Sequence, residues 1–475
     1  MRPSFTSSSE RRWTHECGIV AVGAYAPDSR IAAEAFTEAW GRFDAPGVET
    51  KAVLDADEDA LTMAVEAARR ALDAGGVSGS DVDGLRFATT SPPLEEETLT
   101  VRLGSFLDIA ADASHRVSTG STRAGVDALF DALDADGTEL VVVSDAPRGE
   151  PDDSREHAAG AGAAALLVGD NASATVTERA EHTDPRPGTR FRRRGEANVE
   201  GLDVGTYDRA AFVEPVEAAV AALETTDGTD EDAIALQAPN GKLPYRTSLE
   251  AGSIAAVETV SELGDTAAAS VPLSLVRAFE EGHDRALCVS WGAGAGASAF
   301  VVDGVAPVET ALDAGVEIDY PSYLRRRGDV IGEQPDGGAA HVPVPTWRRS
   351  LAQRHRHEAG RCPACGGLAF PPEGACPSCR SLVEFEPVEL PLEGEVEAAT
   401  TIGQGGAPPE FSEQQAKSGA FGVAIVRFEA NGSVSLPMQV VGETSVGETV
   451  RAVPRRVYVE EGVPRYGLKA LPTVG

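Results

Sequence analysis

Short apolar runs alternate with longer amphipathic stretches over the first two thirds of the chain. The apolar runs predict strands at residues 17–27, 85–90, 139–145, 161–169 and 233–239, with a strand, a Gly/Ala turn and a second strand over 285–302. The amphipathic stretches predict helices at 60–76, 121–134, 207–224 and 274–282, the first opened by Asp57-Glu58-Asp59. This alternation is typical of α/β folds in which helices cover both faces of sheets.

The pattern changes after residue 327. Residues 328–346 are rich in Gly and Pro and have no clear period, which predicts a linker. An Arg-rich segment and four cysteines follow over 347–382, and residues 383–475 contain short alternating strands between turn residues, which predict a small OB-type β-barrel. We therefore expect a flexible tail at 1–16 and an α/β domain at 17–327, with halves at about 17–170 and 171–327.

The composition is that of a globular protein, with 42% hydrophobic residues among 475. No apolar run is long enough to span a bilayer, so we expect no membrane association. Residues 1–16 are polar and lack the apolar segment of a secretory signal. The six cysteines do not form a disulfide pattern, which together with the missing signal predicts a cytoplasmic protein.

Acidic residues greatly outnumber basic ones. The 75 Asp and Glu against 41 Lys and Arg give a formal charge of −34, and the chain has only four lysines. The acids are spread along the sequence and do not form one block, which indicates a surface adapted to high salt. So negative a chain should repel phosphate backbones, so we expect no nucleic-acid partner.

The strongest local motif is a pair of CxxC turns, Cys362/Cys365 and Cys376/Cys379. Each turn presents two thiolates, and two turns complete a closed tetrahedral zinc site. A closed shell leaves no position for a substrate, so we interpret the zinc as structural and not catalytic. Zinc removal should unfold the segment because it is too short to have a core of its own.

Several stretches of the first domain match a known family in order and spacing: CGIVAVGAYAP (17–27), GVETKAV (47–53), DEDALTMAVEAARRAL (57–72), QAPNGKLP (237–244) and GAGAGASAF (292–300). They resemble archaeal hydroxymethylglutaryl-CoA (HMG-CoA) synthases, members of the thiolase superfamily. This resemblance implies a duplicated α-β-α-β-α fold. RCPACGGLAFPPEGACPSCRS and the barrel after it resemble the zinc-ribbon/OB-fold proteins that archaeal thiolases and synthases use in acyl-CoA complexes.

The resemblance also implies a cysteine nucleophile, a glutamate acid/base and a histidine, and this chain departs from all three. The glutamate position aligns with Thr90, the cysteine position with Ser118 in the stretch 118–122, and the histidine position with Gln237. The Gly-Asn turn of the family becomes Gly264-Asp265. These replacements predict a protein that has lost the condensation chemistry.

Two other sources of a nucleophile remain open. Cys17 and Cys288 lie in apolar runs, where a free cysteine usually packs as a small hydrophobic residue. His115 precedes Ser118 by three positions, so a Ser-His pair is conceivable.

The parts of the family motif that bind ligand are retained. The resemblance implies that Lys242, with Asn240 beside it, lies near the phosphates of coenzyme A. Five arginines (Arg348, Arg349, Arg354, Arg356 and Arg361) precede or enter the ribbon, where they could hold a CoA phosphate or form salt bridges with the acidic domain.

Two functions follow. The first is a catalytically degenerate synthase homologue that binds acyl-CoA or acts as a scaffold, as a homodimer and with a thiolase partner, as the resemblance implies. The second is an active acyl-CoA transferase or condensing enzyme with an altered nucleophile such as Ser118. The joint replacement of the cysteine, glutamate and histidine favours the first.

Overall fold

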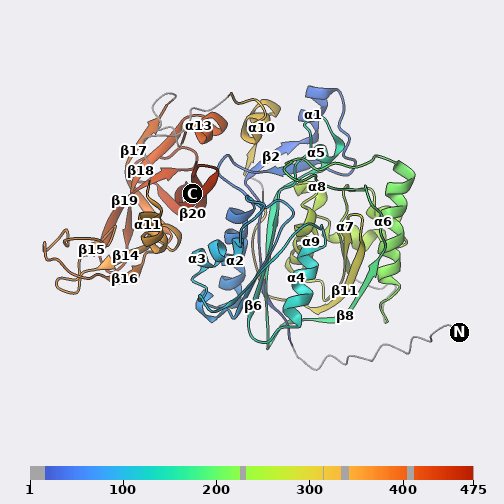
Figure 1. The fold of residues 1–475 in the computed structure, drawn as a ribbon, viewed down its shortest axis with the longest axis horizontal. Coiled ribbons are helices and arrows are strands. Elements are labelled where there is room, and N and C mark those ends of the chain that lie inside the picture. The colour runs from blue at the N-terminus through green and yellow to red at the C-terminus, as the bar shows by residue number, and fades with distance from the viewer. Residues whose placement is uncertain (1–16, 225–231, 314, 333–341, 404–410, 474–475) are drawn as a thin grey trace.

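The computed structural model describes residues 17–224, 232–313, 315–332, 342–403 and 411–473. Two parts are visible in Figure 1. The larger, which we call the body, comprises residues 17–332. The smaller, which we call the C-terminal unit, comprises residues 342–473.

The body is built on a ten-stranded sheet with the order β5-β4-β6-β7-β1-β8-β11-β10-β9, with β12 paired to β1. Its strands are β1 (Gly18–Tyr25), β4 (Gly84–Ala88), β5 (Ser114–Ser118), β6 (Glu139–Asp145), β7 (Gly162–Gly169), β8 (Ala174–Thr183), β9 (Ala233–Leu236), β10 (Arg285–Gly292), β11 (Gly296–Gly304) and β12 (Val308–Ala311). Strands β1 and β8 are joined only through Ile19 and Ala174. The sheet therefore divides there into two halves that lie in separate layers (Figure 1).

Helices form three further layers around these halves. Helices α2 (Ala60–Gly75) and α3 (Leu99–Leu107) cover the outer face of the first half, and α6 (Gly205–Val220) and α7 (Ala251–Val257) cover that of the second. Helices α4 (Ala124–Leu133) and α9 (Ser270–Glu280) lie between the halves (Figure 1). The layered α-β-α-β-α arrangement expected from the sequence is confirmed.

The remaining elements of the body lie mostly along one edge of these layers. They are α1 (Ala33–Trp40), α5 (Ser154–Ala158), α8 (Val260–Leu263), α10 (Tyr320–Arg327), the 3₁₀ turns η1 (Gly79–Asp81), η2 (Pro244–Arg246) and η3 (Ala267–Ala269), and a small sheet of β2 (Ser29–Ala32), β3 (Thr50–Val53) and β13 (Val316–Glu317). Within the described ranges, no helix has the length and apolar character needed to cross a membrane.

Helix α2 shows how the local sequence sets an element. The Asp59 side chain accepts hydrogen bonds from the backbone N–H groups of Leu61 and Thr62, and the Thr62 hydroxyl accepts one from the N–H of Asp59. This capping box starts the helix at the predicted place, and Gly76 ends it in a left-handed conformation. Even Glu66 and Arg70 are buried on this helix, because the C-terminal unit covers it.

The C-terminal unit begins with two short helices and the ribbon strands. These are α11 (Val344–Arg349), α12 (Leu351–His355), β14 (Glu358–Arg361), β15 (Leu368–Ala369) and β16 (Glu386–Glu389). A closed barrel of order β17-β18-β19-β21-β20 follows, formed by β17 (Glu393–Ile402), β18 (Phe421–Glu429), β19 (Ser433–Val440), β20 (Thr449–Glu460) and β21 (Val463–Pro472), with α13 (Ser412–Ser418) between β17 and β18. The predicted small barrel is confirmed.

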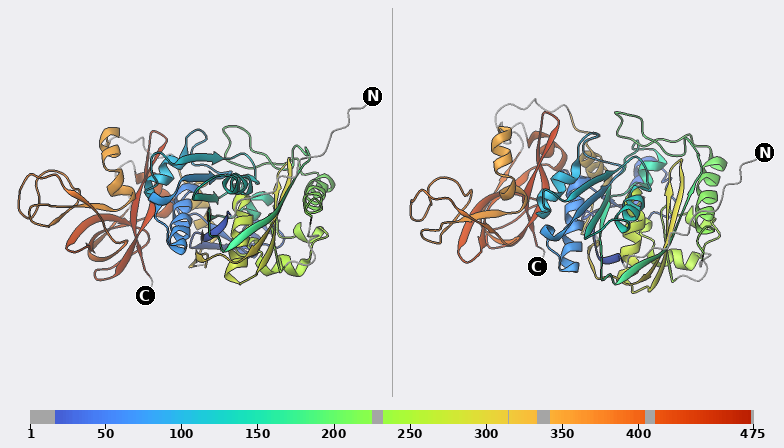
Figure 2. Two further views of the ribbon diagram at one scale, coloured as in Figure 1. Left: turned by 90° about the horizontal axis from the view of Figure 1, so that it is seen from below. Right: turned by 60° about the horizontal axis from the view of Figure 1, so that its bottom comes forward.

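The C-terminal unit packs against α2 and α3 of the body (Figures 1 and 2). His355 of α12 stacks on Phe106 of α3 with ring centroids 4.0 Å apart, and its Nδ1 lies 2.9 Å from the Ser105 hydroxyl. Arg356 reaches Asp108 of the body at 3.3 Å. Of the five arginines at the ribbon, Arg356 therefore forms an ion pair with the body.

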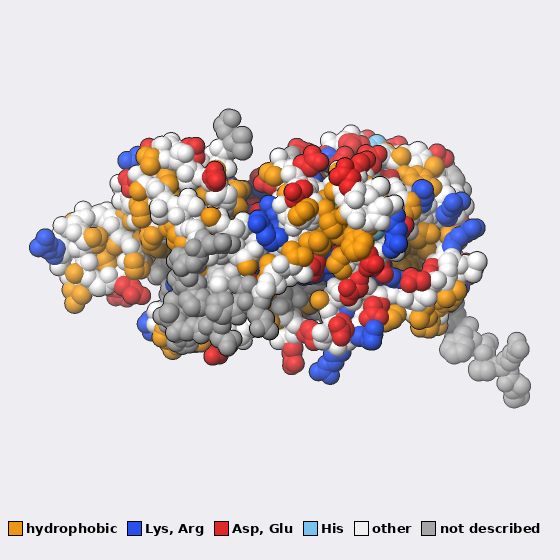
Figure 3. All heavy atoms as spheres, turned by 90° about the horizontal axis from the view of Figure 1, so that it is seen from above, with side chains coloured by type: hydrophobic (Ala, Val, Ile, Leu, Met, Phe, Trp, Pro, Cys, Tyr) orange, Lys and Arg blue, Asp and Glu red, His pale blue; other side chains and the backbone are white. Residues whose placement is uncertain are grey.

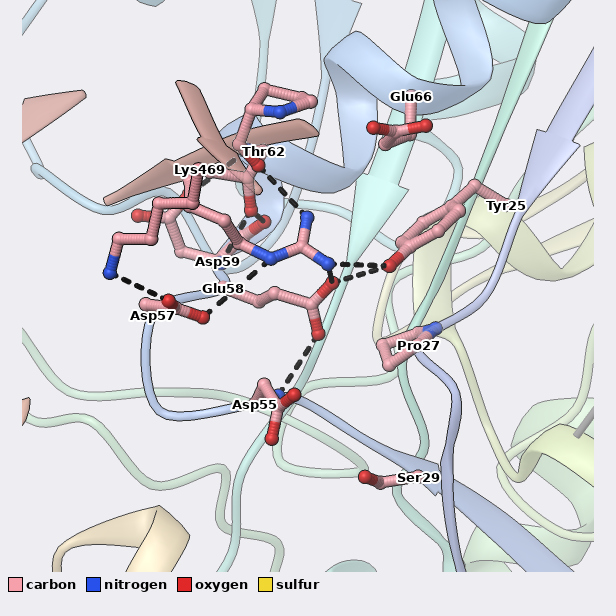
Figure 4. A network of polar contacts seen from close by, with 12 residues as sticks. Tyr25, Pro27, Ser29, Asp55, Asp57, Glu58, Asp59, Thr62, Glu66 and Lys469 are labelled. Carbon is pink, nitrogen blue, oxygen red and sulfur yellow. Dashed lines mark hydrogen bonds and ion pairs between the residues drawn. The ribbon is translucent and has the colours of Figure 1, made fainter. Parts of the chain in front are cut away.

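Buried ion pairs form the centre of this contact (Figure 4). Lys469 of β21 lies 2.7 Å from Asp57, and Arg455 of β20 lies 3.1 Å from Glu58 and 3.6 Å from Asp57. Tyr466 donates to Asp59 at 2.8 Å. All of these side chains are buried, so each charge depends on its partner across the interface for the stabilisation that water would otherwise give.

Replacing Arg455 with methionine should lower the free energy of unfolding by about 3–5 kcal/mol, because Glu58 and Asp57 stay buried with fewer partners. The matched control is Arg427→Met, since Arg427 pairs with Glu395 on the barrel surface and its loss should cost about 1 kcal/mol or less. Guanidinium unfolding of the three proteins measures both changes. Equal, small losses would show that the interface does not depend on Arg455.

His357 should make stability depend on pH. Its Nδ1 donates to the Pro391 carbonyl at 3.0 Å, and burial lowers its pKa from 6.5 to about 4. Below pH 6.5 His357 binds a proton in the unfolded chain but stays neutral in the folded protein. Acidification from pH 7 to 5 therefore lowers the free energy of unfolding by up to about 1.4 kcal/mol per pH unit at this residue. Asparagine keeps a donor and tolerates the φ of 58° found here, but does not titrate.

His357→Asn should therefore reduce the slope of unfolding free energy against pH between pH 7 and 5, by the equivalent of about one proton taken up on unfolding. Denaturant titrations at several pH values give the slope directly. The same slope in both proteins would mean that His357 does not contribute to acid destabilisation.

Candidate functional site

The four positions singled out by the family resemblance follow strands or turns of the body. Thr90 comes two residues after β4, Ser118 ends β5, and Gln237 follows β9. Asp265 lies in the turn between α8 and η3. Strands β4, β5 and β6 are mutually parallel in the order β5-β4-β6, so Thr90, Ser118 and Asp145 leave the same edge of the sheet.

Asp145, at the end of β6, organises this edge. Its carboxylate accepts hydrogen bonds from the N–H and hydroxyl of Thr90, both at 3.0 Å, from the Ser91 hydroxyl at 2.6 Å and from the Ala268 N–H at 3.1 Å. Burial raises its pKa, while these bonds act in the opposite direction. Asp145 thus joins the ends of β4 and β6 to η3, and it takes the Thr90 hydroxyl as a donor.

Sequence reasoning did not single out Asp145. The available signal was a carboxylate at the end of the apolar run ELVVVSD, where a buried strand reaches a loop. That signal says only that a polar group stands at a strand end. The groups that donate hydrogen bonds to Asp145 belong to residues 90, 91 and 268. These residues are far from Asp145 in the sequence, so the sequence does not place them together.

Ser118 stands at the strand end and not at the start of the following helix. Its carbonyl accepts a hydrogen bond from the Thr89 N–H, as part of the β4–β5 ladder. Ser121 and Thr122 occupy the turn that enters α4, and the Thr122 hydroxyl donates to the Trp291 carbonyl at 2.6 Å. The helix predicted over 121–134 thus begins at Ala124, because 121–123 form this entry turn.

The structure does not form the conceivable Ser-His pair. His115 and Ser118 are three residues apart on β5, so their side chains leave opposite faces of the strand. Within the described residues, no hydrogen bond joins them, and the Nδ1 atom of His115 is buried without a hydrogen-bond partner. His115 therefore does not act as a base that activates the Ser118 hydroxyl.

Gln237 belongs to a row of polar side chains on the inner face of the second half-sheet. Ser290 pairs with Ser298 across β10 and β11, and Gln237 continues β9 beside Ser290. Gln237 and Ser298 are both 0% exposed. Neither amide atom of Gln237 nor the Ser298 hydroxyl has a hydrogen-bond partner among the described residues, so the row has unused donors and acceptors. The Ser290 hydroxyl is 3.5 Å from the Thr122 carbonyl, which places the row beside the entry to α4.

Asp265 lines a cavity of about 170 Å³ together with Arg155, Arg190, Asn240 and Trp291. The Asp265 carboxylate pairs with Arg190 and accepts a hydrogen bond from the Ala267 N–H at 2.9 Å. The side chain of Asn240 accepts from the N–H groups of Lys242 and Leu243, which shapes the turn, and Lys242 is exposed. The cavity therefore joins Asp265 to the Asn240 turn, whereas Thr90, Ser118 and Gln237 do not line it.

The two cysteines of the body differ from reactive thiols. Cys288 lies in β10 and is 0% exposed, and burial raises its pKa strongly. Cys17 precedes β1, and burial followed by the charges of Asp170 and Glu139 raises its pKa. A raised pKa keeps a thiol protonated, which makes it a poor nucleophile. Neither residue lines the cavity of Asp265.

The four ribbon cysteines are arranged as a metal site. Their sulfur atoms all lie within 4.8 Å of one another, with 3.8 Å between Cys362 and Cys379 and 3.7 Å between Cys365 and Cys376. A zinc ion with bonds of about 2.3 Å to four thiolates requires sulfur separations of about 3.8 Å. The donor set and spacing fit zinc, which would cross-link the two CxxC turns.

Each CxxC turn closes in the same way. The Gly366 N–H bonds to the Cys362 carbonyl and the Arg380 N–H to the Cys376 carbonyl, both at 2.8 Å. Gly366 and Arg380 both have left-handed backbone conformations, with φ of 76° and 60°. The two turns are therefore equivalent, as the repeated motif suggests.

Zinc analysis of the purified protein should find about one zinc per chain, and Cys376→Ser should lose most of it because three thiolates leave the tetrahedral shell open. The control is Cys288→Ala, which removes a buried thiol in β10 and should keep the metal. Proteolysis at the ribbon should increase in Cys376→Ser only. Full zinc retention in that variant would contradict the assignment of Cys376 as a ligand.

The comparison with known families first concerns the ribbon. Residues 349–386 match the family model described as "ChsH2, rubredoxin-like zinc ribbon domain". The match covers α12, β14, β15 and all four cysteines, and it ends at the first residue of β16. The predicted zinc ribbon is thereby confirmed as a domain type.

The body resembles solved structures in its fold. A crystal structure of HMG-CoA synthase complexed with CoA superimposes with a TM-score of 0.59 at 18% identity, covering 69% of this chain and 94% of the other. A 3-oxoacyl-[acyl-carrier-protein] synthase III from Aquifex aeolicus gives 0.53 at 16% identity, covering 60% and 99%. These likenesses establish the thiolase-like fold.

Sequence relatives establish more than the fold. HMG-CoA synthase of Thermococcus gammatolerans is 30% identical over 355 residues, which cover 66% of this chain and 97% of the relative. The synthase of Aeropyrum pernix is 30% identical over 353 residues, covering 66% and 95%. The family resemblance noted in the sequence is confirmed across nearly the whole length of these relatives. This chain belongs to the HMG-CoA synthase family and carries a ChsH2-type zinc ribbon after the synthase-like body.

Proposed function

We propose that this protein binds an acyl-CoA thioester in its body without transferring the acyl group to a cysteine. The observation that carries this proposal is the position of the thiols: Cys17 and Cys288 are the only cysteines before residue 362, and burial raises the pKa of both. Acyl transfer to sulfur needs an accessible thiolate. We therefore infer that the fold of this chain serves binding.

The groups at the other family positions suit binding better than proton transfer. The Thr90 hydroxyl is already bonded to Asp145, and a glutamine amide neither gives nor takes a proton near neutral pH. The Nε2–H of Gln237 has no partner among the described residues, but Gln237 is fully buried and does not line the cavity of Asp265. Gln237 therefore does not supply the acid of the family mechanism.

The turn of Asn240, a residue that lines the cavity of Asp265, suits the phosphates of coenzyme A. Asn240 holds the turn that carries Lys242, and the Lys242 side chain is exposed beside it. A lysine on a rigid turn binds phosphate as a point charge. We therefore assign Lys242 as the phosphate anchor, with Asn240 acting through the backbone.

The C-terminal unit supports a scaffold role. Its strand order, with β17 closing on β20, fits an OB-type barrel, and its ribbon projects away from the body (Figure 1). The edge strand β5 leaves one side of the first half-sheet unpaired, which suits a two-fold homodimer. We propose a homodimer whose ribbon and barrel dock a thiolase-type partner.

An active acyltransferase using Ser118 is the second candidate. It would need a base beside Ser118, and His115 leaves the opposite face of β5. This geometry favours binding over transfer.

Radiolabelled acetyl-CoA separates the two functions. We expect saturable binding by calorimetry, but no label on protein recovered after denaturation, in both the natural protein and Ser118→Ala. Stoichiometric label that Ser118→Ala abolishes would establish the transferase instead.

Lys242→Gln should weaken CoA binding about tenfold and reduce its salt dependence, because one charge-assisted phosphate contact is lost. Arg427→Gln, on the barrel surface, is the matched loss of a positive charge and should leave affinity unchanged. Equal affinity of the Lys242 and Arg427 variants for CoA would show that Lys242 does not bind the phosphates.

A further inference from the structure

A second, larger cavity lies between the body and the C-terminal unit. It measures about 340 Å³ and is bounded by β3, the loops after β4 and β6, and α10. Lys417 of α13 and Arg456 of β20 close it from the C-terminal unit. It shares no lining residue with the cavity of Asp265, so the two are separate spaces.

The charge of this cavity departs from that of the whole chain. Seven Lys or Arg and six Asp or Glu side chains line it, whereas the chain has 41 of the former and 75 of the latter. Two of the four lysines, Lys51 and Lys417, are among them. Basic, acidic and apolar side chains are also intermixed on the face seen in Figure 3, so basic residues are not excluded from this side of the molecule.

Most of the lining charges neutralise one another. Lys51 lies 2.9 Å from Glu156, which also pairs with Arg327. Arg326 lies 2.8 Å from Asp55. Lys417 lies 2.6 Å from Glu413 on its own helix. These pairs account for the buried Lys51 and for the two arginines of α10 that line the cavity.

Arg192 and Arg456 differ from these residues. Arg192 donates to the Thr90 carbonyl, and Arg456 donates to the Ala56 carbonyl at 2.7 Å. In the described parts of the chain, neither guanidinium has a carboxylate within ion-pair distance. Each has five N–H donors, so each keeps donors for a ligand. One comes from the body and the other from the C-terminal unit, and both line the same cavity.

The walls between these cations are largely apolar. Leu54, Pro92, Pro93, Ala146 and Pro147 line the cavity beside the charged groups. Guanidinium groups bind carboxylates through paired N–H donors, and apolar walls favour a carbon chain over a free inorganic ion. The complementary ligand is a short aliphatic carboxylate.

We propose that this cavity is a binding site for a small aliphatic carboxylate, held by Arg192 of the body and Arg456 of the C-terminal unit. The site is formed only when the two units are docked. It adjoins the family position Thr90 through the bond from Arg192, on a side that the cavity of Asp265 does not reach. It does not depend on CoA binding, which is tested separately with Lys242→Gln.

Calorimetric titration with glutarate at fixed ionic strength tests the proposal on the full chain. We expect saturable binding of about one glutarate per chain, and at least about tenfold weaker binding in Arg192→Gln and in Arg456→Gln, since each removes a charge-assisted contact. The uncharged 1,5-pentanediol should not bind. Inorganic phosphate should bind much more weakly than glutarate because it makes no contact with the apolar walls.

Arg193→Gln is the matched control, because Arg193 is the next residue in the same loop, is exposed and pairs with Glu200. It should bind glutarate like the natural protein. Thermal unfolding checks that each variant is folded, and Arg192→Gln alone decides the outcome if Arg456→Gln loosens the interface. No saturable glutarate binding, unchanged affinity in Arg192→Gln, or equal affinity for phosphate or pentanediol would overturn the proposal.

Discussion

The structure depends on charges that are buried where the two units meet. Asp57 and Glu58 precede the first buried turn of α2, and they lose hydration when the C-terminal unit covers them. Arg455 and Lys469 compensate for that loss at short range. A charge that stays buried without a partner costs several kcal/mol, so while the units are docked the buried charges of each depend on partners in the other.

This docking explains how the few lysines are used. Lys51 and Lys469 are buried and paired with acids, and Lys417 pairs with Glu413. Only Lys242 is exposed without such a pair among the described residues. In a chain that otherwise takes its positive charge from arginine, lysine is kept where a compact ammonium group fits a buried carboxylate.

Hydrogen bonds organise the edge of the sheet at which β4, β5 and β6 end. Asp145 ties together the ends of β4 and β6 and the turn η3 through hydroxyl and backbone donors. The row from Gln237 to Ser298 keeps polar groups on the inner face beside α4. The hydrogen bonds that organise this edge converge on the Asp145 carboxylate and do not involve a thiol.

The sequence by itself determined the local features of this protein. Apolar periods located the strands and helices, Asp59 and Gly76 delimited α2, and two CxxC turns specified a zinc ribbon, because each signal lies within a few residues. Five stretches in family order and spacing, from residues 17–27 to 292–300, indicated the family. The tertiary structure alone decided that Asp145 meets Thr90 and Ala268, that Ser118 ends a strand, and that Arg192 and Arg456 share a cavity. These residues are separated by tens to hundreds of positions, and only packing of the sheet and docking of the C-terminal unit bring them together.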